Sequence, residues 1–277
     1  MISVSHLTAL DASPEDFICH AADAGFDAVG LRINPPVHTP DQWPVAGDIT
    51  RAKALRRIAD DLGIAILEIE TFSIWPDFTI EKLLPGLEAG AELGARFVLS
   101  AGIDDEQARL VENYGTLCDA AAGFGLTVGL EFMPFRPMAT LVHTLRTIEA
   151  VNRPNAKLLI DTLHLDRSGS GVSEITGRVR DHLGYVHLCD AVAKRPSPEK
   201  FAEEARNARF YPGEGVLPLA DIVRALPQAA AFSIEAPNPH YRHLAPAERI
   251  RIAGEKTRAF FNNIRAQAPE ERTSHAL

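Results

Sequence analysis

Short apolar runs alternate with longer amphipathic stretches along the whole chain. The runs are rich in β-branched and aliphatic residues, and each has the length of a strand buried on both faces. The expected strands are Ile2–His6, Ala28–Ile33, Ile64–Thr71, Phe97–Ala101, Thr127–Glu131, Lys157–Asp161, Gly184–Leu188 and Phe232–Glu235. Strands that alternate with helices in this way predict a parallel sheet.

Helical periodicity and capping residues mark the segments between these strands. Ser13 followed by Pro14 is typical of a helix start, and a glycine follows several of the predicted helix ends. The expected helices are Pro14–Ala24, Arg51–Leu62, Ile80–Leu93, Glu106–Ala122, Ala139–Val151, a short one around Val172–Val179, and Pro246–Gln267. Of the remaining segments, Ala191–Gly215 is a connection long enough to suggest a functional loop, and Ala268–Leu277 is an expected polar tail.

The number of units and the length of the chain together predict the fold. A (β/α)8 barrel typically has about 250 residues, and this chain has 277. An open doubly wound sheet would carry a glycine-rich phosphate turn after its first strand, whereas Leu7-Thr8-Ala9-Leu10 stands there. We therefore predict an α/β protein made of a single (β/α)8 TIM barrel over residues 1–267.

Composition excludes several classes of protein. The formal net charge of -9 opposes a nucleic-acid partner, which requires an excess of Lys and Arg. We expect no membrane span, because no apolar stretch approaches ~18 residues, and no secretory signal, because no basic segment precedes an apolar one at the N-terminus. Cys19, Cys118 and Cys189 form no CxxC pair, so neither a disulfide framework nor a zinc-thiolate site is expected. A cytoplasmic protein is the resulting expectation.

Acidic and imidazole side chains end four successive predicted strands. These residues are Glu131, Asp161, His187 and Glu235. A single carboxylate in this position is more often a helix N-cap or a surface residue, so the argument depends on the four together. Carboxylates that share a partly buried rim repel one another and lose hydration, and a divalent cation removes that cost. Such an oxygen-rich set with one nitrogen favours Mn²⁺, with Mg²⁺, Co²⁺ or Zn²⁺ as alternatives.

The segments around these residues resemble the xylose isomerase-like TIM barrels, the superfamily of sugar phosphate isomerases and epimerases. The matching segments are Gly129-Leu130-Glu131, Ile160-Asp161-Thr162-Leu163-His164, His187-Leu188-Cys189-Asp190, Tyr211-Pro212-Gly213-Glu214-Gly215 and Ile234-Glu235-Ala236. The resemblance implies that Glu131 and Glu235 bind the metal and exchange protons with the substrate. It also implies that Asp161 and His187 complete the coordination and that His164 contacts substrate oxygens.

Further polar residues at the rim are candidates for substrate binding. Besides His164, they are His6, Arg32, Glu70, Arg209 and Glu214. A cation at the rim can hold a substrate carboxylate or phosphate. Arg32 is favoured because its strand neighbours are apolar, whereas a loop cation such as Arg209 is more often a solvated surface charge. Glu214 is equally well explained by the chemistry of the Pro-Gly-Glu-Gly turn.

The candidate metal site predicts an enzyme that removes a proton α to a carbonyl of a sugar, polyol or hydroxy-ketone, and the resemblance implies that it is a divalent-metal-dependent isomerase or epimerase. A dehydratase or other lyase acting on a keto-polyol or a dehydroshikimate-like substrate shares the first step and stays open. An AP-endonuclease-like hydrolase is a minor alternative, because His ligands are missing where strands three and four end. A non-catalytic scaffold is a further minor alternative. The expected partners are a small carbohydrate-like substrate and further copies of the chain, as a dimer or tetramer.

Overall fold

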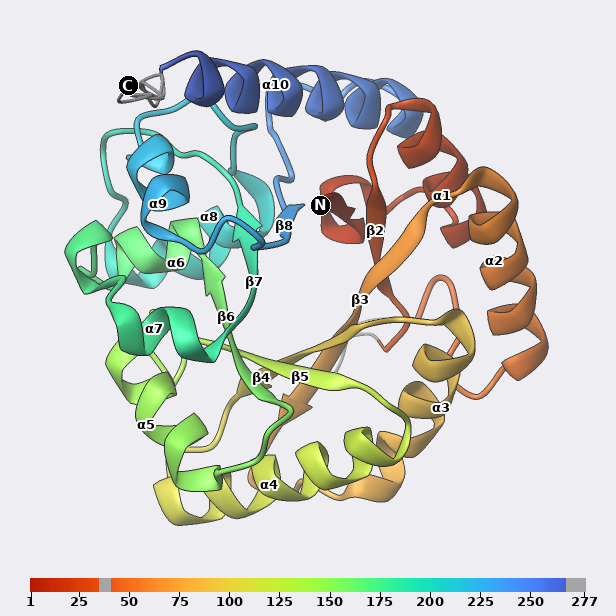
Figure 1. The fold of residues 1–277 in the computed structure, drawn as a ribbon, viewed down its shortest axis with the longest axis vertical. Helices are drawn as coiled ribbons and strands as arrows, with labels where there is room; N and C mark the ends of the chain where they lie inside the picture. Colours follow the sequence, from red (N-terminus) through yellow and green to blue (C-terminus); the bar gives the residue numbers. More distant parts are fainter. Residues whose placement is uncertain (35–40, 268–277) are drawn as a thin grey trace, which may run out of the picture.

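Eight parallel strands close into a barrel in the computed structural model, which describes residues 1–34 and 41–267 (Figure 1). The strands are β1 Ile2–Ser5, β2 Ala28–Arg32, β3 Ala65–Ile74, β4 Phe97–Gly102, β5 Thr127–Glu131, β6 Ala156–Asp161, β7 Leu183–Leu188 and β8 Phe232–Ile234. Each strand pairs with the next in the chain, and β8 pairs with β1. The predicted TIM barrel is confirmed.

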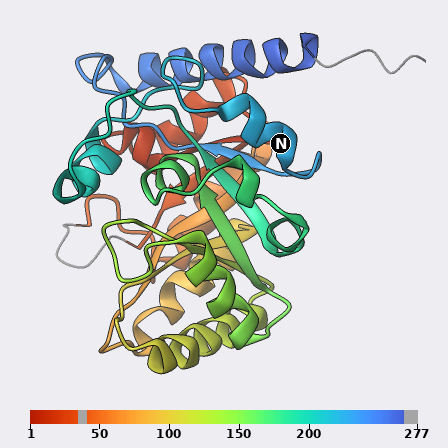
Figure 2. The ribbon, with the colours of Figure 1, turned by 90° about the vertical axis from the view of Figure 1, so that its left-hand side faces the viewer.

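Helices surround the barrel, as Figures 1 and 2 show from two directions. They are α1 Pro14–Asp23, α2 Ile49–Leu62, α3 Leu84–Leu93, α4 Gln107–Gly123, α5 Leu141–Val151, α6 Thr162–Arg167, α7 Gly177–His182, α8 Phe201–Asn207, α9 Leu219–Ala225 and α10 Pro246–Ala266. None of the helices in the described part of the chain is long and apolar enough to cross a bilayer. The expected polar tail, residues 268–277, lies outside the described residues.

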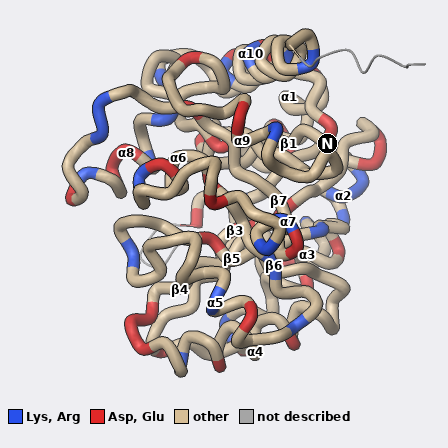
Figure 3. The backbone as a smooth tube through the Cα atoms, turned by 60° about the vertical axis from the view of Figure 1, so that its left-hand side comes forward, with Lys and Arg blue, Asp and Glu red and all other residues tan. Residues whose placement is uncertain are grey.

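Local sequence signals set several of the helix bounds. The Ser13 side chain accepts the N–H of Asp16 and caps α1 at Pro14, as predicted. Basic and acidic positions are interspersed along the helices visible in Figure 3, and some of them form surface ion pairs such as Arg56–Asp60. The acidic surplus of the chain is therefore not gathered on a single helix.

Most predicted bounds agree with the structure to within one or two residues, and three elements differ by more. The expected helix Ile80–Leu93 is divided into a 3-10 turn, Ile80–Lys82, and α3, because Pro85 at the start of α3 has no N–H with which to continue a helix. The expected helix around Val172–Val179 is a 3-10 turn, Val172–Glu174, followed by α7. β3 extends to Ile74, since the run of β-branched and aromatic residues continues beyond Thr71.

Two helices near the carboxyl ends of the strands, α6 and α8, were not predicted, and neither was α9, which precedes β8. α6 begins directly after β6, where the Asp161 side chain caps it. α8 lies inside the long connection that follows β7, where a buried ion pair between Arg167 of α6 and Glu204 of α8 fastens it. Neither α6 nor α8 has the length at which helical periodicity is recognisable in a sequence.

The interior of the barrel has an apolar lower layer. Ala28, Leu67, Phe97, Leu99, Leu159, Tyr185 and Ala231 form a small cluster separate from the main core, which lies between the strands and the helices. Because side chains alternate along a strand, the residue two positions after an inward-facing residue also faces inward. Asp161 thus follows Leu159, and His187 follows Tyr185, so that polar groups fill the layer at the carboxyl ends of the strands.

Asp190 holds together the long connection after β7. Its buried carboxylate accepts the backbone N–H groups of Ala191 at 2.9 Å, Gly213 at 3.1 Å and Leu217 at 2.9 Å. Gly215 lies so close that a β-carbon there would be 2.5 Å from the Asp190 Oδ1 atom. The Pro-Gly-Glu-Gly turn is therefore attached directly to the end of β7.

We predict that Asp190→Ala lowers the free energy of unfolding by about 3 kcal/mol, because it leaves buried N–H donors without an acceptor. Urea unfolding measures this loss, and hydrogen exchange at Gly213 and Leu217 should accelerate. Asp221→Ala on the exposed face of α9 is the control and should change stability by less than about 0.5 kcal/mol. Unchanged exchange at Gly213 in Asp190→Ala would contradict this account.

Candidate metal centre

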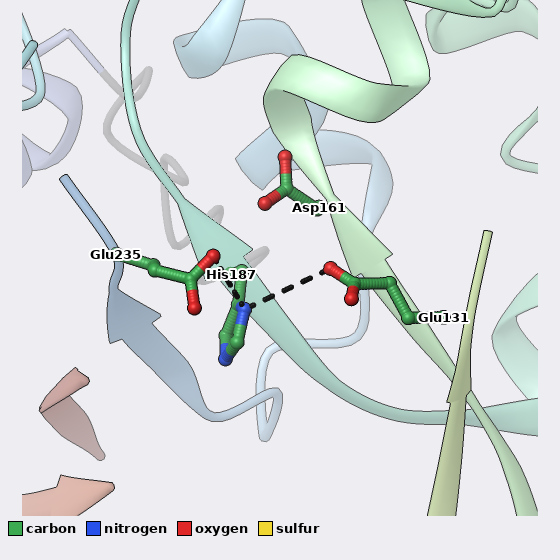
Figure 4. Close-up of side chains that lie close together, drawn as sticks. All are labelled: Glu131, Asp161, His187 and Glu235. Carbon is green, nitrogen blue, oxygen red and sulfur yellow. Dashed lines mark ion pairs between the residues drawn. The ribbon is translucent and has the colours of Figure 1, made fainter. Parts of the chain in front are cut away.

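Four predicted ligands meet at the carboxyl ends of neighbouring strands (Figure 4). Glu131, Asp161, His187 and Glu235 are all buried, and each offers one ligand atom within 4.8 Å of those of the others. The Nδ1 atom of His187 lies 3.3 Å from Glu235 Oε2 and 4.0 Å from Glu131 Oε1. Side chains that are as much as 104 positions apart in the sequence thus converge at one place.

The pairing of the strands explains this convergence. Asp161 of β6 is the direct neighbour of His187 of β7, and Glu131 of β5 is the neighbour of Leu159, two residues before Asp161. Glu235 follows β8, and its N–H donates to the carbonyl of Leu188 at the end of β7. The parallel register therefore brings all four residues to the same level of the barrel.

Glu131 is the carboxylate with the least compensation. Burial, together with the charges of Glu235 and Asp161, raises the pKa of Glu131 well above its usual range. Its Oε1 atom has no hydrogen-bond partner among the described residues. His164 Nε2 lies 3.9 Å from it, but burial lowers the pKa of His164 to about 4, so this imidazole is neutral at pH 7. A positive charge is therefore most needed beside Glu131.

Arg209 compensates the other two carboxylates. Its guanidinium contacts the Asp161 carboxylate and lies 3.1 Å from Glu235 Oε2. Burial opposes ionisation of both acids, but Arg209 and His164 lower the pKa of Asp161, and His187 and Arg209 lower the pKa of Glu235. Burial lowers the pKa of His187, but the charges of Glu235 and Glu68 outweigh this effect and raise it. Glu131 and Glu235 are thus biased toward opposite protonation states.

The donor set fits a divalent cation. Three carboxylates and one imidazole are hard or borderline ligands of the kind that Mn²⁺, Mg²⁺ and Zn²⁺ accept. Two of the ligand atoms, Glu131 Oε1 and His187 Nδ1, are buried without a hydrogen-bond partner among the described residues. A cation among the four residues would complete the coordination of both atoms and neutralise the charge on Glu131.

Arg32 and Glu70 lie beside this group and are bound to each other. The Arg32 Nη2 atom lies 2.7 Å from Glu70 Oε2, and the Ser5 hydroxyl lies 2.9 Å from Glu70 Oε1 and 3.3 Å from Glu235 Oε1. Burial opposes ionisation of Arg32, but the negative charge of Glu70, with smaller contributions from Glu235 and Glu131, raises the pKa of Arg32. These two predicted substrate-binding residues therefore adjoin the ligands, and their role in binding stays a prediction.

His164 also adjoins the ligands. Phe135 packs edge-on against its ring, with 5.5 Å between the ring centroids. The neutral imidazole and its aromatic neighbour form one wall of the site beside Glu131. Contact between His164 and a substrate stays a prediction that this position favours.

The side chains of Arg209, His6 and Glu214 are held by hydrogen bonds and ion pairs to other residues of the chain. Besides its two carboxylates, Arg209 donates from Nε to the Ala205 carbonyl at 2.6 Å. His6 Nε2 donates to the Ala12 carbonyl at 3.0 Å, which leaves Nδ1 to accept the Arg32 N–H at 3.4 Å. Glu214 accepts from Asn238, Tyr241 and Lys256, none of which is a candidate ligand. The proposed substrate contacts of these three residues stay predictions.

The sequence interpretation did not include Glu68. This carboxylate lies on β3, is fully buried, and is 2.9 Å from His187 Nε2. Glu68 and Glu70 stand two positions apart in an apolar strand, which was the one sequence signal that both face the barrel interior. Because the sequence does not show what lies opposite an inward-facing residue, it gave no reason to connect Glu68 with His187.

Within residues 1–34 and 41–267, only these four residues form a group of three or more possible metal ligands. A three-zinc centre of the endonuclease type requires more ligands than the group supplies. The geometry therefore favours a single-metal site and disfavours the hydrolase alternative.

Comparison with known proteins gives a consistent result. A model of the family described as "Xylose isomerase-like TIM barrel" matches residues 19–260. The inosose isomerase of Halalkalibacterium halodurans is 27% identical over 146 residues, which are 51% of this chain and 50% of that protein, so the match spans about half of its length. An L-ribulose 3-epimerase of Methylomonas sp. is 33% identical over 87 residues, 30% of each chain.

A solved structure, the IOLI protein with a bound zinc atom, shares the fold. Its TM-score is 0.81 at 19% identity, and the match covers 95% of this chain and 98% of that one. At this identity the likeness concerns the fold, and the zinc atom belongs to that protein.

Addition of Mn²⁺ should stabilise the protein through the four ligands. At a free concentration of 100 times its Kd, the ion should raise the free energy of unfolding by about 2.7 kcal/mol, and EDTA should reverse the effect. In Glu131→Gln the metal-free protein should be at least as stable as wild type, because a buried carboxyl group whose ionisation is opposed by its surroundings is gone, while the gain from Mn²⁺ should shrink. Urea unfolding with and without Mn²⁺ measures both effects.

The control for this experiment is Glu88→Gln on the exposed face of α3, which should keep the full Mn²⁺ effect. Equal stabilisation of Glu131→Gln and wild type by Mn²⁺ would remove Glu131 from the ligand set.

Buried His6 should make the protein less stable in mild acid. Burial lowers the pKa of His6 to about 4 from an ordinary value of 6.5. As the pH falls, the unfolded chain therefore takes up this proton first, so the stabilisation is complete above pH 6.5 and is lost toward pH 4. Between pH 7 and pH 5, His6→Asn should lose about 2 kcal/mol less unfolding free energy than wild type. Denaturant titrations at both pH values measure the difference.

The matched control is His240→Asn at an exposed position, which should retain the pH dependence of wild type. The same acid loss in His6→Asn as in wild type would show that His6 does not cause it.

Proposed function

Because the chain belongs to the xylose isomerase-like TIM barrel family, we propose that it is a divalent-metal-dependent isomerase or epimerase of a sugar or a related hydroxy-ketone. The observation that carries the proposal is the position of Glu131 and Glu235. The two carboxylates face each other from opposite sides of the ligand group (Figure 4). Two acid-base groups on opposite faces of a planar enediolate are what proton removal and return on different faces require.

The two carboxylates have complementary roles in the reaction. Glu235 is held ionised by His187 and Arg209, so it is in the form that can accept the proton α to the carbonyl. Glu131, whose ionisation is opposed by burial and by its acidic neighbours, suits the return of a proton on the other face. When bound, a divalent cation would polarise the substrate carbonyl and stabilise the negative charge that develops on its oxygen.

The surrounding residues position these groups and limit access of water. Asp161 and Glu235 are fixed by Arg209, so neither carboxylate has to reorient during proton transfer. The neutral His164 beside Glu131 is placed to hydrogen-bond a substrate oxygen, and Phe135 covers one side of its ring. The Arg32–Glu70 pair adjoins Glu235 through Ser5 and supplies further polar contacts for a hydroxylated substrate.

The relatives suggest where the search for a substrate should begin. Their names are inosose isomerase and L-ribulose 3-epimerase, so cyclic inososes and ketopentoses are the first compounds to test. Return of the proton to the same carbon gives epimerisation, return to the neighbouring carbon gives aldose–ketose isomerisation, and departure of a β-hydroxyl gives dehydration. The product decides among the three, since all begin with the same proton removal.

Turnover in D₂O tests the reaction type directly. With Mn²⁺ and an inosose or ketose substrate, we expect deuterium at the carbon next to the carbonyl in recovered substrate or product, without loss of water. NMR and mass spectrometry read this out. A conjugated enone absorbance would instead identify a dehydratase. Metal binding with no exchange on any inosose, ketose or keto acid would favour the non-catalytic scaffold.

Glu131→Gln and Glu235→Gln should each lower kcat by at least about 100-fold, because each removes one acid-base group. Circular dichroism checks that both variants remain folded, and Glu88→Gln on the surface of α3 should retain wild-type kcat. A fully active variant at either site would exclude that residue from proton transfer.

A further inference from the structure

The His187–Glu68 contact lies deeper in the barrel than the ligand group. Both side chains are fully buried, and Glu68 Oε2 is 2.9 Å from His187 Nε2. The other oxygen of Glu68, Oε1, has no hydrogen-bond partner among the described residues. Glu70 is paired with Arg32. By contrast, no Lys or Arg among the described residues lies within ion-pair distance of Glu68.

This contact determines which nitrogen of His187 is free. Glu68 lies on the Nε2 side of the ring and is an acceptor, so Nε2 carries a proton and donates it. Nδ1 is on the opposite side, 3.3 Å from Glu235 Oε2 and 4.0 Å from Glu131 Oε1, without a hydrogen-bond partner of its own. Nδ1 is therefore the nitrogen that a cation among the carboxylates would meet, and binding would displace any proton that it carries.

We propose that Glu68 is a positioning residue: it holds the Nε2–H of His187 and thereby directs Nδ1 toward the metal-binding carboxylates. The inference rests on the metal site of the proposed function and adds to it a residue that touches neither substrate nor ion. A carboxylate behind a ligating imidazole fixes the orientation of the ring and increases its basicity, which strengthens metal binding.

Neighbouring residues limit the positions that the Glu68 side chain can adopt. Gly30 on β2 is its direct partner in the sheet, and a β-carbon at Gly30 would be 2.5 Å from Glu68 Oε1 and 2.6 Å from Cγ. The Tyr185 ring packs edge-on against His187 at 5.5 Å and lies tilted against Phe97 at 4.7 Å. The missing side chain at residue 30 thus provides the space in which Glu68 reaches His187.

Zn²⁺ is the probe for the test, because it is diamagnetic and borderline ligands bind it well. Zn²⁺ affinity is measured by chelator competition in wild type, Glu68→Gln and Glu68→Ala. We expect Glu68→Ala to bind about 10- to 100-fold more weakly. Glu68→Gln should lose less, because its amide oxygen still accepts the Nε2–H. Glu88→Gln on α3 is the surface control and should bind as wild type does.

Gly30→Ala tests the same contact without changing the carboxylate. It should weaken Zn²⁺ binding in the wild-type background, because it displaces Glu68, and should weaken it little further in Glu68→Ala. In ¹⁵N-histidine-labelled, Zn²⁺-loaded protein, the Nε2–H proton of His187 should be observed in wild type and shift upfield in Glu68→Gln. A role of Glu68 in packing alone would leave this resonance unmoved in Glu68→Gln.

The outcomes separate this inference from the proposed function. Wild-type Zn²⁺ affinity in a folded Glu68→Ala would overturn the inference and leave the metal site intact. Failure of wild-type protein to bind Zn²⁺ would overturn both the metal site and the role of Glu68. Weaker binding in the Glu68 variants, together with no turnover of any substrate, would support the positioning role while rejecting the proposed activity.

Discussion

The carboxyl end of the barrel depends on the compensation of buried negative charge. Glu68, Glu70, Glu131, Asp161 and Glu235 are all at most 5% exposed, within a layer that apolar side chains close from below. Carboxylates without hydration must be paired or neutralised. Glu70 has Arg32, Asp161 and Glu235 share Arg209, and Glu68 has His187. Among the described residues, Glu131 has only longer contacts, 4.0 Å to His187 Nδ1 and 3.9 Å to His164 Nε2, and this weaker compensation fits a divalent cation at the site.

The compensation of charge at the site also depends on a segment outside the barrel strands. Arg209 comes from the long connection after β7, and its reach to Asp161 depends on the fastening of that segment by Asp190 and by the Arg167–Glu204 pair. Loops that carry functional groups need such support from a rigid frame. The barrel supplies the four candidate ligands from its strand ends, whereas the connection supplies the charge that lowers the pKa of two of them. The stability of the connection after β7 and the pKa values of Asp161 and Glu235 are therefore linked.

Much of the fold follows from local patterns. Thr127–Glu131 was predicted to the residue, and α1 begins at Pro14 as its Ser13 cap indicates. The errors have local causes too: Pro85 divides a predicted helix, and α6 and α8 are shorter than the periodicity that identifies a helix. A short helix is decided by its contacts, here the Asp161 cap and the Arg167–Glu204 pair, and those contacts join residues that are distant in sequence.

The sequence by itself determined the alternation of strands and helices, the barrel, and the four candidate ligands at consecutive strand ends, because each is a periodic or terminal feature of a local segment. Only the tertiary structure decided which side chains face one another. It placed Arg209, a candidate for substrate binding that a solvated surface charge could equally explain, as a buried partner of Asp161 and Glu235. It also placed Glu214 among structural contacts and brought Glu68 to His187 across 119 residues. Register, strand tilt and the space left by Gly30 set those distances, and such distances arise only when the sheet closes into a barrel.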